Sequence, residues 1–182
     1  MRIIGGQLKG RNLIAPKTLP VRPTTDFAKS ALFNILSNYF DFSELRMLDL
    51  FCGTGSISFE FASRGCTDIT CVDEHALCLK FIRETSAKLG IEKIHCVKFD
   101  AFKYLQKFAD SYDLIFADPP FIDPATDEIP GIVFQRSLLK PGGWLVVEHQ
   151  AKRVLQSSVQ PSDVRIYGNC AFSIYKNEVA TG

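Results

Sequence analysis

The chain has 182 residues, 46% of them hydrophobic and 23% charged, with a formal net charge of +1. This length fits one globular domain with its own core and leaves little room for a second domain. No apolar run approaches the roughly 20 residues that cross a bilayer, and the first ten residues lack the apolar stretch of a signal peptide. We therefore expect a cytoplasmic protein with no membrane contact.

The basic residues gather at the front of the chain. Residues 1–29 hold six basic side chains and one acid, a balance of +5, while the remainder holds 15 basic and 19 acidic side chains, a balance of −4. Such a basic segment on a mildly acidic body favours contact with a phosphate backbone, although a solvated basic hairpin is the alternative.

The first two elements precede the main repeat of the fold. Residues 2–16 hold two short apolar segments around a Gly-Gly-Gln-Leu-Lys-Gly turn, which predicts a β-hairpin. We expect it to form a basic extension over residues 1–23 on a core over residues 24–182, within a single domain. Residues 24–40 then place apolar side chains at helical spacing, and Thr24 or Thr25 can cap the helix.

From Arg46 onward, short apolar runs alternate with helical stretches at 56–64, 76–89 and 101–108. This alternation predicts an α/β, Rossmann-like fold with a central, mostly parallel sheet flanked by helices. The final segments VRIYG and CAFSIYK predict a closing antiparallel hairpin. The six cysteines show no Cys-x-x-Cys spacing, so we expect reduced thiols and no metal site.

A glycine-containing loop follows the first predicted strand, in the sequence DLFCGTGSIS. Ligands of open parallel sheets bind beyond the carboxyl ends of the strands, where glycines let the backbone approach closely. Ser58 stands where a dinucleotide fingerprint has its third glycine, which favours a different nucleoside cofactor. The candidate cofactor contacts in this loop are Asp49, Phe51, Gly53 and Gly55.

The next two strands also end in acids, Asp73 and Asp100. Asp73 can accept hydrogen bonds from ribose hydroxyls, and Asp100 with the N–H of Ala101 can pair with adenine. Acidic strand ends suit S-adenosylmethionine, which has an amine and a ribose but no phosphate. The alternatives are structural: Asp49 can brace the loop, and Asp73 and Asp100 can cap the helices that follow them.

The fourth strand ends in Asp118-Pro-Pro-Phe121. The Asp118 carboxylate and the Pro119 carbonyl can accept both N–H bonds of an exocyclic amine and orient its lone pair, and Asp118 is also a candidate cofactor contact. Pro120 restricts the loop, and Phe121 offers a face on which a base can stack. No metal is required. An ordinary Asp-Pro turn is the alternative.

With Asp49-Leu-Phe-Cys-Gly-Thr-Gly55, Asp118-Pro-Pro-Phe121, the opening RIIGGQLKG and VRPTTD at residues 21–26, the chain resembles the RsmD family. The resemblance implies a class I methyltransferase fold and S-adenosylmethionine-dependent methylation of a guanine N2 in small-subunit (16S) ribosomal RNA. It places Arg22 and Thr24 near the cofactor and the RNA entrance. It also directs the basic side chains of the hairpin toward phosphates, namely Arg2, Lys9 and Arg11.

Departures from the family pattern concentrate in the first helix. Family members usually carry arginine, and then arginine followed by glutamate, where this chain has Phe27, Lys29 and Ser30, which changes the polar contacts of that helix. The acid after the second strand is commonly glutamate rather than Asp73. On the last hairpin, Tyr167 and Phe172 could stack a base or pack as an ordinary strand pair.

Other functions stay open at this point. An adenine-N6 or protein-glutamine methyltransferase uses a similar loop, and a non-catalytic RNA-binding assembly factor would share the basic front. The expected partner is ribosomal RNA within a small-subunit assembly particle, bound by a monomer.

Overall fold

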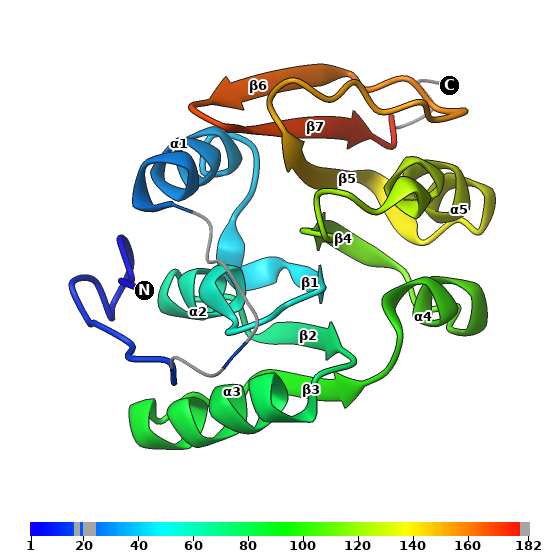
Figure 1. Ribbon diagram of the computed structural model, residues 1–182. Coiled ribbons are helices and arrows are strands. Elements are labelled where there is room, and N and C mark those ends of the chain that lie inside the picture. The colour runs from blue at the N-terminus through cyan, green and yellow to red at the C-terminus, as the bar shows by residue number, and fades with distance from the viewer. Residues whose placement is uncertain (17–18, 20–24, 179–182) are drawn as a thin grey trace.

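The computed structural model describes residues 1–16, 19 and 25–178 (Figure 1). Its seven strands form one sheet in the order β3-β2-β1-β4-β5-β7-β6. The strands are β1 (Arg46–Leu50), β2 (Asp68–Asp73), β3 (Ile94–Lys98), β4 (Tyr112–Ala117), β5 (Leu139–Gln150), β6 (Asp163–Tyr167) and β7 (Cys170–Lys176). Strands β1 to β5 are parallel, whereas β7 runs antiparallel to both β5 and β6. The predicted sheet and closing hairpin are confirmed.

Five α-helices and two short 3-10 helices connect the strands. They are α1 (Asp26–Leu36), η1 (Phe42–Glu44), α2 (Ser56–Ser63), α3 (Ala76–Leu89), α4 (Ala101–Lys107), η2 (Pro124–Glu128) and α5 (Ile129–Gln135). Thr25 caps α1 by accepting a bond from the Ala28 N–H, as the sequence predicts. None of the helices in the described ranges is long and apolar enough to cross a membrane.

The helices cover both faces of the sheet, with α1, α2 and α3 on one face and α4 and α5 on the other (Figure 1). Strand residues alternate between the two faces, so each strand contributes to two separate apolar cores. On β4, for example, Leu114 and Phe116 join the α1–α2–α3 core while Ile115 and Ala117 join the other. All six cysteines lie in described segments and are free thiols.

The predicted N-terminal β-hairpin is present only in reduced form. The chain turns back between residues 2 and 12, but a single bridge joins Arg2 to Asn12 and no strand is formed. The segment packs against α2, where the N–H groups of Gln7 and Leu8 donate to the Ser63 backbone and hydroxyl oxygens. The two halves of the segment still pair with each other, since the N–H groups of Ile3 and Leu13 donate to the carbonyls of Arg11 and Met1, and α2 binds the turn between them. We refer to residues 1–16 as the arm.

A buried ion pair fixes the arm to the body. Lys29 on α1 is 1% exposed, and its ammonium donates to the Arg2 carbonyl at 2.6 Å and to the Ser56 hydroxyl at 3.2 Å. It lies 3.8 Å from the carboxylate of Glu60, which is fully buried and also accepts the Ile4 N–H. Burial lowers the pKa of Lys29, and the charge of Glu60 opposes that shift. Lys29, one of the departures from the family pattern, thus joins α1, α2 and the arm.

Candidate active site

Three carboxyl groups meet at the carboxyl edge of the sheet. Asp49 pairs in register with Phe116 of β4, and Ala117 pairs with Val147 of β5. Extending that register sets Asp118 beside Glu148. Because alternate strand residues share a face, Asp49, Asp118 and Glu148 all lie on the α1–α2–α3 side.

Asp118 and Pro119 present two acceptors for which the described part of the chain supplies no donor. Among the described residues, none donates a hydrogen bond to the Asp118 carboxylate or to the Pro119 carbonyl, whereas the next carbonyl, that of Pro120, accepts the Asp123 N–H at 2.9 Å. Asp118 is half-buried and Pro119 is buried. A half-buried acceptor pair of this kind can take both hydrogens of an amino group.

The electrostatics of the cluster favour a cation. Burial raises the pKa of Asp118 well above its usual range, and the neighbouring charges of Glu148 and Asp49 raise it further. Burial likewise raises the pKa of Asp49 to about 7, although two bonds from Ser58 oppose the shift. A positively charged ligand bound at this edge would offset the repulsion between the carboxylates and favour their ionised forms.

Asp49 also supports the glycine loop. Its carboxylate accepts the Ser58 N–H at 3.2 Å and the Ser58 hydroxyl at 2.5 Å, so it caps the first turn of α2. The loop between β1 and α2 has positive φ angles at Phe51, Gly53 and Gly55. A side chain at Gly55 would press on Ile82 of α3, which explains why glycine is needed there.

Asp73 holds the same loop from the second strand. One carboxylate oxygen accepts the Gly53 N–H at 2.8 Å, and the other accepts the His75 N–H at 2.8 Å. The second oxygen also contacts Nδ1 of His75 at 3.0 Å, so it is the first oxygen, the acceptor of the Gly53 N–H, that keeps a further lone pair for a ribose hydroxyl. The positive φ of Phe51, 60°, is rare for a residue other than glycine and marks a strained strand end of the type found at functional sites.

Asp100 takes the capping position of α4. Its carboxylate accepts the Lys103 N–H at 2.8 Å, while Ala101, the first helical residue, is buried. Phe102 of the same helix contacts Phe51 edge-on, with ring centroids 5.6 Å apart. The loops after β1 and β3, which both carry predicted cofactor contacts, therefore touch each other.

Arg153 fastens the segment that follows Asp118. Its guanidinium donates to the carbonyls of Phe121 and Asp123 at 3.1 and 3.0 Å and pairs with Asp127 at 3.0 Å. Phe121 itself is half-buried and packs on the apolar core, so only part of its ring is available for stacking. Arg153 therefore holds this loop in place.

The predicted nucleic-acid contacts divide into three groups. Lys9 and Arg11 are exposed on the arm and pair with no acid among the described residues. Arg2 is exposed but pairs with Asp26 at 3.2 Å. Arg22 and Thr24 lie outside the described residues.

Glu148 was missed from the sequence. It stands in WLVVEH at the end of β5, so the strand-end rule that selected Asp49, Asp73 and Asp100 would have found it. It is 4% exposed, and its charge acts on Asp118 and on the Cys170 thiol. His149, the next residue, is structural, since its ring contacts the Ser173 hydroxyl at 2.8 Å.

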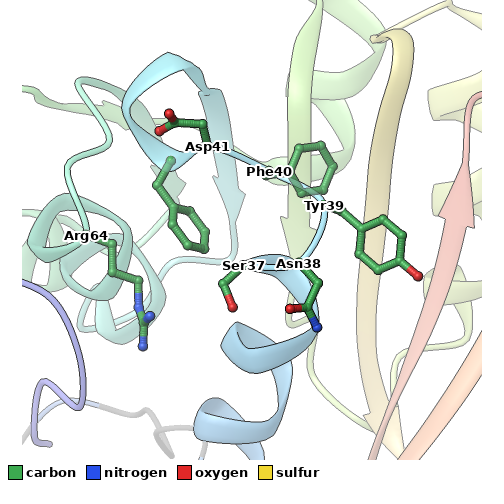
Figure 2. Close-up of a pocket in the computed structure, with 7 residues that line it drawn as sticks. Ser37, Asn38, Tyr39, Phe40, Asp41 and Arg64 are labelled. Atoms are coloured by element: carbon green, nitrogen blue, oxygen red, sulfur yellow. The ribbon is translucent and has the colours of Figure 1, made fainter.

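A surface pocket of about 480 Å³ lies elsewhere (Figure 2). Residues 37–42 and Arg64 line it, with Arg64 and Tyr39 on opposite sides. These residues directly precede β1 or follow α2, which places the pocket at the amino edge of the sheet, opposite Asp118. Its charged groups are already satisfied, because Asp41 accepts two bonds from Ser43 and Arg64 pairs with Glu60.

The strand order and the glycine loop under acidic strand ends define a Rossmann-like, class I methyltransferase fold. The solved structure of the putative methyltransferase yhhF from Escherichia coli has the same fold, with a TM-score of 0.86, 24% identity and 98% of each chain covered.

The chain belongs to the RsmD family. The family model described as conserved hypothetical protein 95 matches residues 1–176. The putative rRNA methyltransferase YlbH of Bacillus subtilis is 31% identical over 97% of this chain and 98% of its own length. Ribosomal RNA small subunit methyltransferase D of Escherichia coli strain K12 is 29% identical over 99% of this chain and 85% of its own length.

Proposed function

We propose that the protein is an S-adenosylmethionine-dependent methyltransferase that modifies the exocyclic N2 of a guanine in small-subunit (16S) ribosomal RNA. The observation that carries the proposal is a pair of acceptors, Asp118 and Pro119, that receive no hydrogen bond from residues 1–16, 19 or 25–178 and lie within a cluster of carboxyl groups. The names of the Escherichia coli and Bacillus subtilis relatives support a ribosomal RNA substrate.

The residues at three strand ends fit the cofactor. Asp73 would accept from the ribose, and Asp100 with Ala101 would pair with the adenine, beside Phe51. Gly53 and Gly55 keep the loop close to the ligand, and the acidic edge suits its cationic groups. When bound, S-adenosylmethionine supplies a methyl group on a positively charged sulfur.

The roles of Asp118 and Pro119 follow from the chemistry of an aromatic amine. Its lone pair is delocalised into the ring, and two accepted N–H bonds hold the nitrogen in a pyramidal geometry with the pair free. The N–C bond forms as the S–C bond breaks, and that electron pair stays on sulfur. The new amine sheds one proton, and a carboxylate with a raised pKa is well suited to receive it.

The substrate-side contacts are also part of the proposal. Lys9 and Arg11, together with Arg2, Arg22 and Thr24, would contact phosphates of ribosomal RNA, in a single-domain cytoplasmic monomer that acts on an assembling small subunit. Attraction between the basic arm and the RNA phosphates would speed up association of the two molecules, and the affinity would fall as the salt concentration rises.

The test uses labelled S-adenosylmethionine and small subunits from a strain that lacks this protein, followed by digestion to nucleosides. Label in N2-methylguanosine supports the proposal. Label in N6-methyladenosine, or none in any RNA fraction, would contradict it.

Asp118→Ala should lower turnover at least about a hundredfold, the usual effect of removing a group that stabilises the transition state, with cofactor affinity nearly intact. Glu128→Ala is the matched control, since Glu128 is exposed ten residues further along the chain and makes no side-chain cap bond. An unchanged rate for Asp118→Ala would refute its orienting role.

A further inference from the structure

An exposed aromatic pair stands at the same edge of the sheet as the candidate active site. Phe27, in the first turn of α1, is 69% exposed, a large fraction for a phenylalanine. Its ring meets the ring of Tyr167, the last residue of β6, edge to face, with centroids 6.0 Å apart and planes at 79°. In Figure 1 the end of β6 lies beside α1.

Behind the pair, a series of ring contacts leads into the apolar core. Tyr167 is half-buried and contacts Phe172 of β7 at 5.9 Å between centroids. Phe172 is fully buried and contacts Phe116 of β4 at 6.3 Å. Because these contacts reach into the core, Tyr167 is held in place before any ligand arrives, and binding on it loses little side-chain freedom.

The same ring contacts lead toward the loop that carries Asp118. Phe116 lies two residues before Asp118, and Phe172 pairs in register with Glu148. Cys170, whose thiol donates to the Tyr167 carbonyl at 3.4 Å, is close enough to Asp118 for that charge to raise its pKa. Tyr167 is therefore linked to the surroundings of the Asp118 carboxylate through its contacts with Phe172 and Cys170.

The other end of the pair joins the basic arm. Asp26, the neighbour of Phe27, pairs with Arg2, whose side chain is 57% exposed. On the strand side, Arg165 lies two residues before Tyr167 on the same face, is exposed and pairs with Asp163 at 2.7 Å. An exposed ring and a half-buried ring between two solvent-exposed arginines match the chemistry of a single-stranded nucleic acid, whose phosphates can compete for arginines that are paired at the surface.

We propose that Phe27 and Tyr167 form a stacking surface for an unpaired RNA base that flanks the nucleotide at Asp118. The inference rests on the proposed function for the identity of the polymer, and it deepens that function by assigning recognition of a neighbouring base. The chain has Phe27 where the family usually has arginine, so the proposed RNA contact at this position is stacking on a ring rather than attraction to a cation.

Two labelled probes test the proposal: a ten-nucleotide oligoadenylate and a ribose-phosphate oligomer of equal length and charge that lacks bases. Dissociation constants come from fluorescence anisotropy at fixed salt. Phe27→Ala should bind oligoadenylate roughly 5- to 100-fold more weakly, the range that loss of one stacked base gives, and should bind the abasic oligomer as the wild type does. Phe27→Leu should lose most of the same affinity, since it keeps apolar area but no ring face.

Ile166→Ala is the matched control, because Ile166 is 62% exposed and adjacent to Tyr167 but faces the other side of the sheet. It should change neither dissociation constant, and equal melting temperatures would show that the variants are folded. Equal weakening for both probes, no weakening for either, or absence of binding by the wild type would overturn the proposal. The assay involves no methyl transfer, so its failure is separate from failure of the methylation test.

Discussion

The buried carboxyl of Asp49 should make the folded protein less stable as pH rises. Its pKa is about 7 in the folded state, against 3.8 for an ordinary aspartate, because it is fully buried. Between these values the folded carboxyl keeps its proton while the unfolded one has lost it. The unfolded state then binds fewer protons, so the free energy of unfolding falls as pH increases from about 4 to about 7.

The size of the effect follows from the two pKa values. A difference of about 3 pH units corresponds to roughly 4 kcal/mol at pH 8, and about 3 kcal/mol of it develops between pH 5 and pH 8. Asp49→Asn removes the titration and keeps an oxygen that can accept both bonds from Ser58. The variant should therefore gain stability over the wild type by about 3 kcal/mol across that pH interval.

The assay is urea unfolding of both proteins at pH 5, 6, 7 and 8, with the free energy extrapolated to water at each pH. Asp118 titrates in both proteins, but removal of the Asp49 charge lessens the upward shift of its pKa, so its contribution adds to the difference in the same direction. Ser58→Ala is an independent check: loss of the hydroxyl bond that lowers the pKa of Asp49 should extend the window to higher pH. A difference between wild type and Asp49→Asn that stays constant with pH would refute the reasoning.

Three further variants, one of them a double substitution, test the surroundings of the site. Arg153→Ala should release the segment after Asp118 and lower kcat about tenfold with little change in cofactor affinity. Lys152 is the exposed neighbour, and Lys152→Ala should change neither quantity. Steady-state kinetics would measure both variants. Changing Lys9 and Arg11 to Ala together should weaken RNA binding and reduce its salt slope by about 2, and an unaltered slope would place the RNA elsewhere. Lys29→Met should destabilise the protein by roughly 1–3 kcal/mol in urea unfolding, because the Arg2 carbonyl and one Glu60 oxygen lose the ammonium while Arg64 still pairs with the other oxygen, and a neutral effect would contradict that assignment.

The sequence predicted most of the sheet and the positions of the strand-end acids. Both depend on local patterns: apolar runs of strand length, helical spacing between them, and the rule that ligands lie beyond parallel strand ends. Asp73 and Asp100 follow their strands directly, so their placement needed only the correct element boundaries. The aspartate before the glycine loop was found in the same way.

The parts that escaped prediction depend on contacts between distant segments. Arg153 meets Phe121 across 32 positions of sequence, and Lys29 meets the arm across 27. Neither residue lies in a recognisable motif, and both look like ordinary surface charges in the sequence. The β-hairpin expected over the arm keeps the hydrogen bonds between its two halves near Ile3 and Leu13 but forms only one bridge, and its turn is held by Ser63 of α2, a contact that local sequence patterns do not reveal.

The cost of burying Asp49 bears on its role. An asparagine at that position could accept the same two bonds from Ser58, so bracing of α2 alone does not require a carboxyl group whose ionisation opposes folding. A cationic ligand accounts for the charge, since it stabilises the ionised form that burial disfavours. Asp118 and Glu148, placed on the same face by the pairing of β4 and β5, extend the same logic to the whole cluster. We infer that the acidic edge is unfavourable for the empty protein and becomes favourable when a positively charged methyl donor binds.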